Sequence, residues 1–444
     1  MPEQPLSVWR QLGYAFGMLG WSIMINIIAV MLIYFYIPPN NSGMEQLIPQ
    51  ATVFGIFTLL SLIAASGRLF DAVTDPLIAY WSDRFHHPRG RRIPFMRAAI
   101  LPSVLFGILV FLPLEYQESY SNVWWLAAIQ AGFYLSLTVY IIPYNALLPE
   151  LAPGPAAKVR LSTWLSLAFV LGIILSSQTP AMADLIQEWG HVANRHVAFQ
   201  LAIGSLYILG GIFMLIPLFS IDEQRDCYGQ PATIPLREAF RHILTHRNFL
   251  VFIVADFSYF VSITIISSGM LYFVKVLLFL KEGIGGAVMG VMVLFSLLFY
   301  PLVVRLANRV EKRKLVIWSL LSLGVVMLGI FFLGKIPLPP RVQIFGFALL
   351  VAVPTAFLGI LPYALIAEIA EQDGNHTGQQ KEAMFFAVRN FSTKLGQTVG
   401  IMAFAILTLL GKDPFDDLGI RLAAVFGGAL CILAGLIFTR FEEP

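Results

Sequence analysis

The chain has 444 residues, of which 58% are hydrophobic and only 12% are charged. A soluble domain carries about 25% charged and 45–50% apolar residues, so this composition excludes a soluble globular protein and a disordered chain. It indicates an all-α membrane protein. The net charge of +3 is too small to indicate a nucleic-acid partner. One of the two cysteines, Cys227, lies in a polar stretch and the other, Cys431, in an apolar run, so we expect no metal cluster and no cofactor.

Twelve apolar runs follow one another along the chain, each near the roughly 20 residues that a membrane-spanning helix needs. Their centres lie near residues 24, 62, 104, 135, 170, 208, 262, 294, 324, 355, 396 and 430. The first run is too long for a cleaved signal sequence. The longest polar stretch lies between the sixth and seventh runs. It divides the chain into a six-helix bundle at 1–220, a cytoplasmic linker at 221–246 and a second six-helix bundle at 247–444.

The linker contains apolar residues at helical spacing, which predicts an amphipathic helix around residues 236–244. Its basic face suggests a position on the inner membrane surface, and a plain connecting helix is the alternative. Lys and Arg are concentrated in the segments that face inward when both termini are cytoplasmic. We therefore expect a multi-pass protein of the plasma (inner) membrane, surrounded by lipid, with both termini in the cytoplasm.

The two halves of the chain are similar to each other. Residues 75–84 align without gaps on 300–309, and residues 146–152 align on 364–370. Both offsets are close to half the chain length, which indicates a parallel repeat about an axis along the membrane normal. Such repeats are typical of transporters whose substrate site lies between the halves.

Five segments together resemble one transporter family: 67–77 (GRLFDAVTDPL), 82–84, 89–95, 142–151 and 391–396. They are similar to the glycoside–pentoside–hexuronide:cation symporters, the melibiose-permease branch of the major facilitator superfamily. The resemblance implies twelve transmembrane helices in two pseudo-symmetric bundles, and cation-coupled symport by alternating access, in a protein expected to be a monomer. Eukaryotic sodium-dependent lysolipid transporters share the first motif, so it indicates the family better than the substrate.

Six ionisable residues lie inside the apolar runs, where a charge is costly unless it is paired or hydrated. They are Arg68, Asp71, Asp75, Asp256, Arg389 and Lys394. Asp71 and Asp75 are four residues apart and share a helix face, so their repulsion favours a bound proton or metal cation. The resemblance implies that these acids bind the coupling cation, Na⁺ or H⁺, together with Thr138, and Thr74 lies between them. The alternative is an ion pair between Arg68 and Asp71.

The remaining intramembrane charges have open roles. By resemblance, Lys394 would lie near the cation site and, with Arg68, balance the acids when the cation is absent; a permanent counter-ion is the alternative. Asp256 and Arg389 do not belong to the family pattern. They either pair with each other or contact the substrate.

A group of charges at the predicted inner surface suggests a gate of salt bridges that break as the halves move. The alternative is ordinary inward-facing loop charge. The group comprises Asp83, Arg84, Arg91, Arg92, Glu150, Arg309 and Glu368.

The sequence departs from the sugar-binding members of the family at three positions. Those members have an acid, an acid and an arginine where this chain has Ser22, Ile141 and Leu165. An unpaired buried polar group is costly, so a melibiose-like binding mode is not expected. Four aromatic residues surround these positions and could stack on a sugar, line a site for an amphiphile, or simply pack: Trp21, Tyr140, Tyr144 and Trp164.

These patterns predict a symporter of a small organic solute, with a sugar or glycoside as the family default. The alternatives are an amphiphile or lysolipid transporter and an uncoupled facilitator of the same fold. An enzyme is not expected, because all seven histidines lie in loops or at helix ends and form no catalytic constellation within the membrane.

Overall fold

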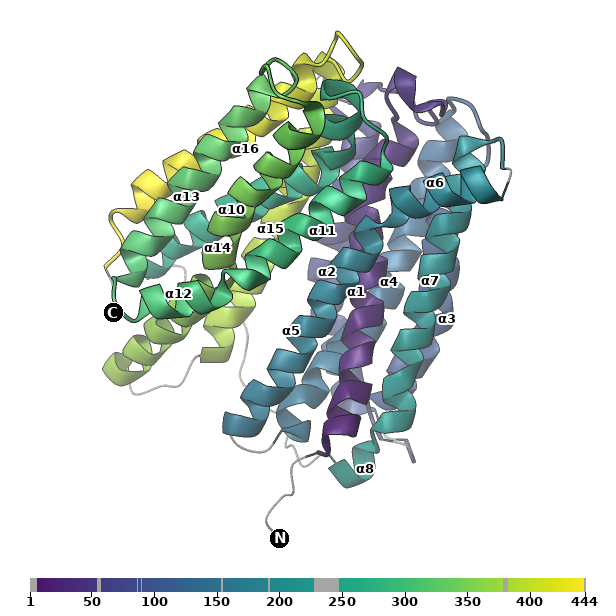
Figure 1. Ribbon diagram of the computed structural model, residues 1–444. Helices are drawn as coiled ribbons and strands as arrows, with labels where there is room; N and C mark the ends of the chain where they lie inside the picture. Colours follow the sequence, from purple (N-terminus) through teal and green to yellow (C-terminus); the bar gives the residue numbers. More distant parts are fainter. Residues whose placement is uncertain are drawn as a thin grey trace. The chain divides into compact units, whose positions relative to one another are not determined.

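The computed structural model describes residues 6–53, 57–85, 87–88, 90–152, 155–190, 192–226, 247–377 and 382–442. Helices make up nearly all of these residues, and the chain divides into two compact units (Figure 1). The first unit comprises Met1–Pro38, Gly43–Gly55 and Leu62–Ala232. The second comprises Pro39–Ser42, Ile56–Ser61 and Thr233–Pro444.

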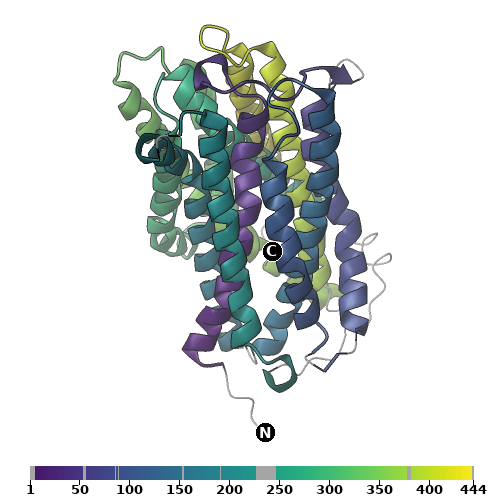
Figure 2. The ribbon, with the colours of Figure 1, turned by 90° about the vertical axis from the view of Figure 1, so that its right-hand side faces the viewer.

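The first unit is built around its N-terminal helix. Its elements are α1 (Val8–Tyr36), β1 (Thr52–Val53), α2 (Leu59–Arg84, within this unit from Leu62), α3 (Ile93–Val110), α4 (Tyr120–Leu151), α5 (Pro155–Ser177), α6 (Thr179–Trp189), α7 (Arg195–Ser220) and α8 (Glu223–Asp226). Helix α1 packs against both α5 and α7, and α3 packs against α4 and α7 (Figure 2). A Cβ atom at Gly20 of α1 would lie 2.3 Å from the carbonyl oxygen of Gly210 in α7, so glycine allows these two helices to touch.

The second unit has α10 at its centre. Its elements are η1 (Asn40–Ser42), β2 (Phe57–Thr58), α10 (Arg247–Tyr272), the π-helical turn η2 (Phe273–Leu277), α11 (Gly283–Leu298), α12 (Tyr300–Ala307), α13 (Lys312–Gly329), η3 (Ile330–Phe332), α14 (Pro340–Thr377), α15 (Glu382–Leu407), η4 (Thr408–Leu410) and α16 (Leu418–Phe438). Helix α10 packs against α14, α15 and α16, and α13 packs against α14 and α16. This arrangement places residues of α10 and α15 side by side although they are more than 130 positions apart in the sequence.

Eleven helices of the described residues are long and apolar enough to cross a membrane. Helix α2 has 26 residues and is the twelfth that the sequence predicts. Its length is sufficient, but every 18-residue stretch of α2 contains Arg68, Asp71 and Asp75. The all-α, multi-pass membrane fold predicted from composition is therefore confirmed, and α2, the least apolar of its long helices, carries the acid pair.

Three details of the predicted elements were wrong or incomplete. Helix α2 begins at Leu59, so its centre lies well after residue 62; the charges of its second half shifted the apolar maximum toward its start. The short helix α6 was not predicted. The single run predicted near residue 294 is two helices, because the helix breaks at Phe299 just before Pro301. The predicted amphipathic helix at 236–244 lies outside the described residues.

Candidate functional site

The two acids of α2 meet one hydroxyl group of α4. The Thr138 Oγ1 atom lies 2.9 Å from Asp71 Oδ1 and 3.4 Å from Asp75 Oδ1. Thr138 and Asp71 are buried, and Asp75 is partly buried. A hydroxyl group carries one proton, so Thr138 can donate to one of these carboxylates at a time and donates best to the nearer one, Asp71. The three residues that the sequence assigned together are thus brought together.

Thr74, the fourth residue predicted for this site, is buried in the turn between the two acids. Its Oγ1 atom donates to the carbonyl oxygen of Phe70 at 3.0 Å, one helical turn earlier. The hydroxyl proton is therefore used within α2, while the oxygen keeps lone pairs that can accept or coordinate. The side chain of Arg68 lies outside the described residues, so its alternative pairing with Asp71 stays a prediction.

Lys394 lies on α15 in the second unit and is partly buried. Its backbone carbonyl accepts a hydrogen bond from Thr398 at 2.8 Å, which is ordinary helix geometry. Its predicted role in balancing the acid pair stays a prediction.

The second unit contains a buried ion pair between α10 and α15. The Arg389 guanidinium donates to Asp256 Oδ1 from Nε at 3.2 Å and from the terminal nitrogen at 2.9 Å. Thr393 donates to the other carboxylate oxygen of Asp256 at 3.3 Å. The guanidinium carbon also lies 3.9 Å from the centre of the Tyr363 ring, within cation–π distance. The pairing that the sequence left open is therefore present, and Tyr363 and Thr393 complete it.

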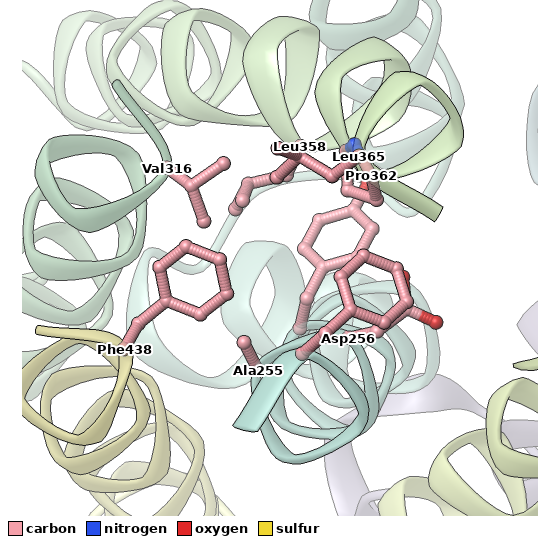
Figure 3. A pocket seen from close by; sticks show the side chains of 9 residues that line it. Ala255, Asp256, Val316, Leu358, Pro362, Leu365 and Phe438 are labelled. Carbon is pink, nitrogen blue, oxygen red and sulfur yellow. The ribbon is translucent and has the colours of Figure 1, made fainter. Parts of the chain in front are cut away.

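A small cavity lies beside this ion pair (Figure 3). Asp256 is its charged residue, and the other lining residues are apolar or aromatic: Phe252, Ala255, Tyr259, Val316, Leu358, Pro362, Leu365 and Phe438. It offers about 10 Å³ to the centre of a water molecule, which is close to the least that one water needs. This cavity is too small for an organic solute.

The aromatic residues predicted to line a substrate site divide into two groups. Tyr140 and Tyr144 are fully buried and stack at 5.6 Å between ring centres. Tyr140 donates to the carbonyl oxygen of Met214 at 3.1 Å, and Tyr144 donates to that of Tyr14 at 2.6 Å. Tyr14 in turn stacks on Tyr144 at 4.3 Å and donates to its carbonyl oxygen. The hydroxyl groups of Tyr140 and Tyr144 therefore donate to the backbone and hold α1, α4 and α7 together.

Trp21 and Trp164 are partly buried. Trp21 lies 6.2 Å from the Phe169 ring, and its buried indole Nε1 has no hydrogen-bond partner among the described residues. Ser22 is fully buried, donates to the carbonyl oxygen of Phe169 at 2.6 Å, and occupies the space that glycine leaves at position 172. Ser22 therefore joins α1 to α5, whereas the buried indole N–H of Trp21 is left unsatisfied among the described residues.

At the start of α3, a carboxylate from α8 accepts hydrogen bonds from consecutive backbone N–H groups. Glu223 accepts from Arg91, Arg92 and Ile93 at 3.0–3.1 Å. The first N–H groups of a helix have no partner inside it, and the helix dipole favours an anion there. Gly90 has φ +97°, and a Cβ atom at this position would lie 2.1 Å from Glu223 Oε2. We call this contact the Glu223 clamp.

Arg91 and Arg92 belong to the predicted gate, whereas Glu223 was not among the predicted residues. Arg92 is buried and donates from its guanidinium to the carbonyl oxygen of Ala146 in α4 at 2.8 Å. No sequence pattern links position 223 to residues 90–93. The contact depends on where the end of α7 places α8 in the folded unit.

The predicted gate residues of the second unit also acquire an unpredicted partner. Glu368 of α14 forms an ion pair with Lys312, at the start of α13. Arg309 is exposed. The side chains of Asp83, Arg84 and Glu150 lie outside the described residues, so the gate as a whole stays a prediction.

Comparison with known proteins identifies the family of this chain. The family described as MFS/sugar transport protein matches residues 13–442. The chain belongs to this family, and it is therefore a membrane transporter rather than an enzyme.

Individual relatives are distant in sequence but similar in length. The uncharacterized symporter YnaJ of Bacillus subtilis is 23% identical over 98% of this chain and 92% of its own. The isoprimeverose transporter of Lactiplantibacillus pentosus is 20% identical over 89% and 81%. The crystal structure of a D-xylose–proton symporter superposes with a TM-score of 0.68 at 15% identity, over 98% of this chain and 97% of that one. At this identity the structural likeness establishes the fold, and transporter relatives imply a small-molecule substrate.

Proposed function

We propose that this transporter is a cation-coupled symporter, in which Na⁺ or H⁺ binds at Asp71 and Asp75 and a small organic solute moves with it by alternating access. One observation carries the proposal: a single hydroxyl group, that of Thr138, lies between an oxygen of Asp71 and an oxygen of Asp75. One hydroxyl proton cannot serve two carboxylates at once. Two like charges this close favour the uptake of a positive charge, either a proton on one acid or a metal cation between them.

The oxygen atoms gathered here suit a hard cation. Carboxylate and hydroxyl oxygens are the ligands that hard metal ions prefer. The two acids and Thr138 supply such oxygens from α2 and α4, and Thr74 adds a hydroxyl oxygen whose proton is directed to Phe70. A cation bound here would replace the repulsion between the carboxylates with attraction, so the empty and loaded states of the site differ in charge.

For the solute, a sugar or glycoside is the starting hypothesis. The name of one relative, the isoprimeverose transporter, supports it. Tyr140, Tyr144 and Ser22 already donate to backbone carbonyls, so they offer little to a sugar hydroxyl group. The indole N–H of Trp21 has no partner among the described residues and is the best donor of that set for a ligand.

The proposed orientation has both termini in the cytoplasm of a plasma (inner) membrane, because Lys and Arg are concentrated in the segments that would then face inward. With this orientation, the Glu223 clamp and the Lys312–Glu368 pair belong to the cytoplasmic end of their respective units. The solute and the cation would enter together from outside.

The test uses the protein in sealed vesicles with D-xylose and isoprimeverose as probes. Uptake should follow an imposed Na⁺ or pH gradient, and Asp75→Asn should abolish that dependence. Glu311→Gln, at an exposed acid paired with exposed Lys314, is the matched control and should behave as wild type. If uptake by Asp75→Asn still follows the gradient, the assigned cation site is wrong. If wild-type uptake ignores both gradients, the protein is an uncoupled facilitator.

A further inference from the structure

In the part of α2 that leads up to Asp71, two contacts join α2 to α4 at the same sequence separation. Gln130 Nε2 donates to the carbonyl oxygen of Ile63, a separation of 67 residues in sequence. Thr138 donates to Asp71, again a separation of 67. On each helix the two positions are eight residues apart, or two turns, so they lie on one face. The two helices therefore run parallel with a constant register through this region.

Between these two contacts, side chains of α4 lie directly against the backbone of α2 at Gly67. Gly67 of α2 has no side chain, and a Cβ atom there would lie 2.2 Å from Cε2 and 2.4 Å from Cδ2 of Tyr134. It would also lie 2.8 Å from Gln130 Nε2. Tyr134 is buried and its ring contacts that of Phe133, so the ring has little room to move aside. Position 67 therefore fixes how near α4 can come to α2.

Gln130 fixes the register along the helix axis. It is 1% exposed, and its Oε1 atom is buried without a hydrogen-bond partner among the described residues. The amide nitrogen nevertheless points to the backbone of α2 at Ile63. A backbone carbonyl is a fixed point of the helix, so this bond resists sliding of α4 past α2.

Resting on the proposed function, we propose that Gly67, Tyr134 and Gln130 are positioning residues of the cation site. They hold α4 at the distance and register that put the Thr138 hydroxyl between the two acids, and they thereby set the affinity of the site for a metal cation relative to a proton. A proton needs one oxygen atom, whereas a metal cation needs several oxygens to converge at once. Displacing α4 therefore weakens metal binding and leaves proton binding by the carboxylates nearly intact.

The experiment measures the thermal stability of the purified full-length protein during titration with NaCl or LiCl, at constant ionic strength with choline chloride, and separately over a pH series. Gly67→Ala should raise the Na⁺ concentration for half-maximal stabilisation by about tenfold. The pH at which the thermal stability of this variant changes should be the same as in the wild type. Gly204→Ala is the matched control, because a Cβ atom at that helical glycine meets nothing within 4 Å.

Two further variants separate positioning from folding. The double variant Gly67→Ala with Tyr134→Ala restores space at the crossing and should recover much of the Na⁺ affinity. Gln130→Leu keeps the side-chain volume but removes the bond to Ile63. Gln130→Leu should weaken Na⁺ binding severalfold without changing how thermal stability depends on pH. If Gly67→Ala does not fold, this variant tests the positioning role.

The outcomes of the experiment distinguish this inference from the proposed function. Wild-type stability that responds to Na⁺, together with unchanged Na⁺ affinity in Gly67→Ala or in Gln130→Leu, overturns the inference and leaves the cation site standing. A wild type that couples to H⁺ alone and never responds to Na⁺ or Li⁺ also overturns it. A wild type that responds to no cation overturns the proposed function itself.

Discussion

The two units of this protein bury charged residues in opposite ways. In the first unit, Asp71 and Asp75 have the same sign and share one threonine hydroxyl. In the second, Asp256 and Arg389 have opposite signs, and Thr393 donates to the remaining carboxylate oxygen. In both arrangements a threonine hydroxyl group donates a hydrogen bond to an aspartate carboxylate inside a helical unit. The second arrangement brings opposite charges together, whereas the first, on the proposed function, would gain a favourable interaction when a cation binds.

The largest effect should come from breaking the neutral arrangement. Arg389→Met leaves the Asp256 carboxylate buried without its charge partner, which should lower the free energy of unfolding by about 3–5 kcal/mol. The double variant Arg389→Met with Asp256→Leu should recover most of this loss. Unfolding in denaturing detergent measures both. A double variant as unstable as the single one would mean that the pair is not the reason for the loss.

The same-sign arrangement should respond differently to the loss of a charge. Asp71→Asn removes repulsion with Asp75, so stability without Na⁺ should not fall. The added stability from Na⁺, about 2.7 kcal/mol at one hundred times the dissociation constant, should disappear. Thermal unfolding with NaCl and with choline chloride measures it. Asp256→Asn should show the reverse pattern, with lower stability and an intact response to Na⁺.

The two threonines allow a matched test at a single hydroxyl group. Thr138→Val should weaken the Na⁺ response by about 1 kcal/mol, roughly fivefold in affinity, because one ligand oxygen is lost. Thr393→Val should cost a similar free energy of unfolding but leave the Na⁺ affinity unchanged. Equal effects of the two substitutions on Na⁺ affinity would remove the distinction between the two regions.

The smallest effect concerns the aromatic partner of the neutral pair. Tyr363 lies under the Arg389 guanidinium and is 53% exposed. Tyr363→Leu should lower the free energy of unfolding by about 0.5–1 kcal/mol, and Tyr363→Phe by less, since the ring is kept. Neither should alter the response to Na⁺, and a change in that response would link the second unit to the cation site.

The sequence predicted the first arrangement better than the second for a physical reason. Asp71 and Asp75 lie on one helix at a spacing of four, so their proximity follows from helix geometry alone. Thr138 came from resemblance to a family. Asp256 and Arg389 lie on helices that meet only after the unit has folded, so the sequence could state that each needed a partner but not which one.

Packing between helices explains the residues whose roles the sequence did not predict. Tyr140 and Tyr144 were candidates for substrate contact, yet their hydroxyl groups donate to backbone carbonyls of neighbouring helices. Gln130 is one polar residue in an apolar run and gave no signal until its bond to Ile63 was visible. The predicted centre of α2 was wrong because a search for apolar runs underestimates a helix that carries several charged residues.

The Glu223 clamp leaves a distinctive pattern of mutational tolerance. Its donors are backbone N–H groups of residues 91, 92 and 93, and every amino acid except proline provides one. For this contact the identity of those side chains does not matter, so selection on it would fall on residues that look unremarkable: glycine at position 90 and an acid at position 223. A saturation library over 90–93 should therefore lose every substitution at Gly90 and every proline after it, while the arginines at 91 and 92 report on their own, separate roles.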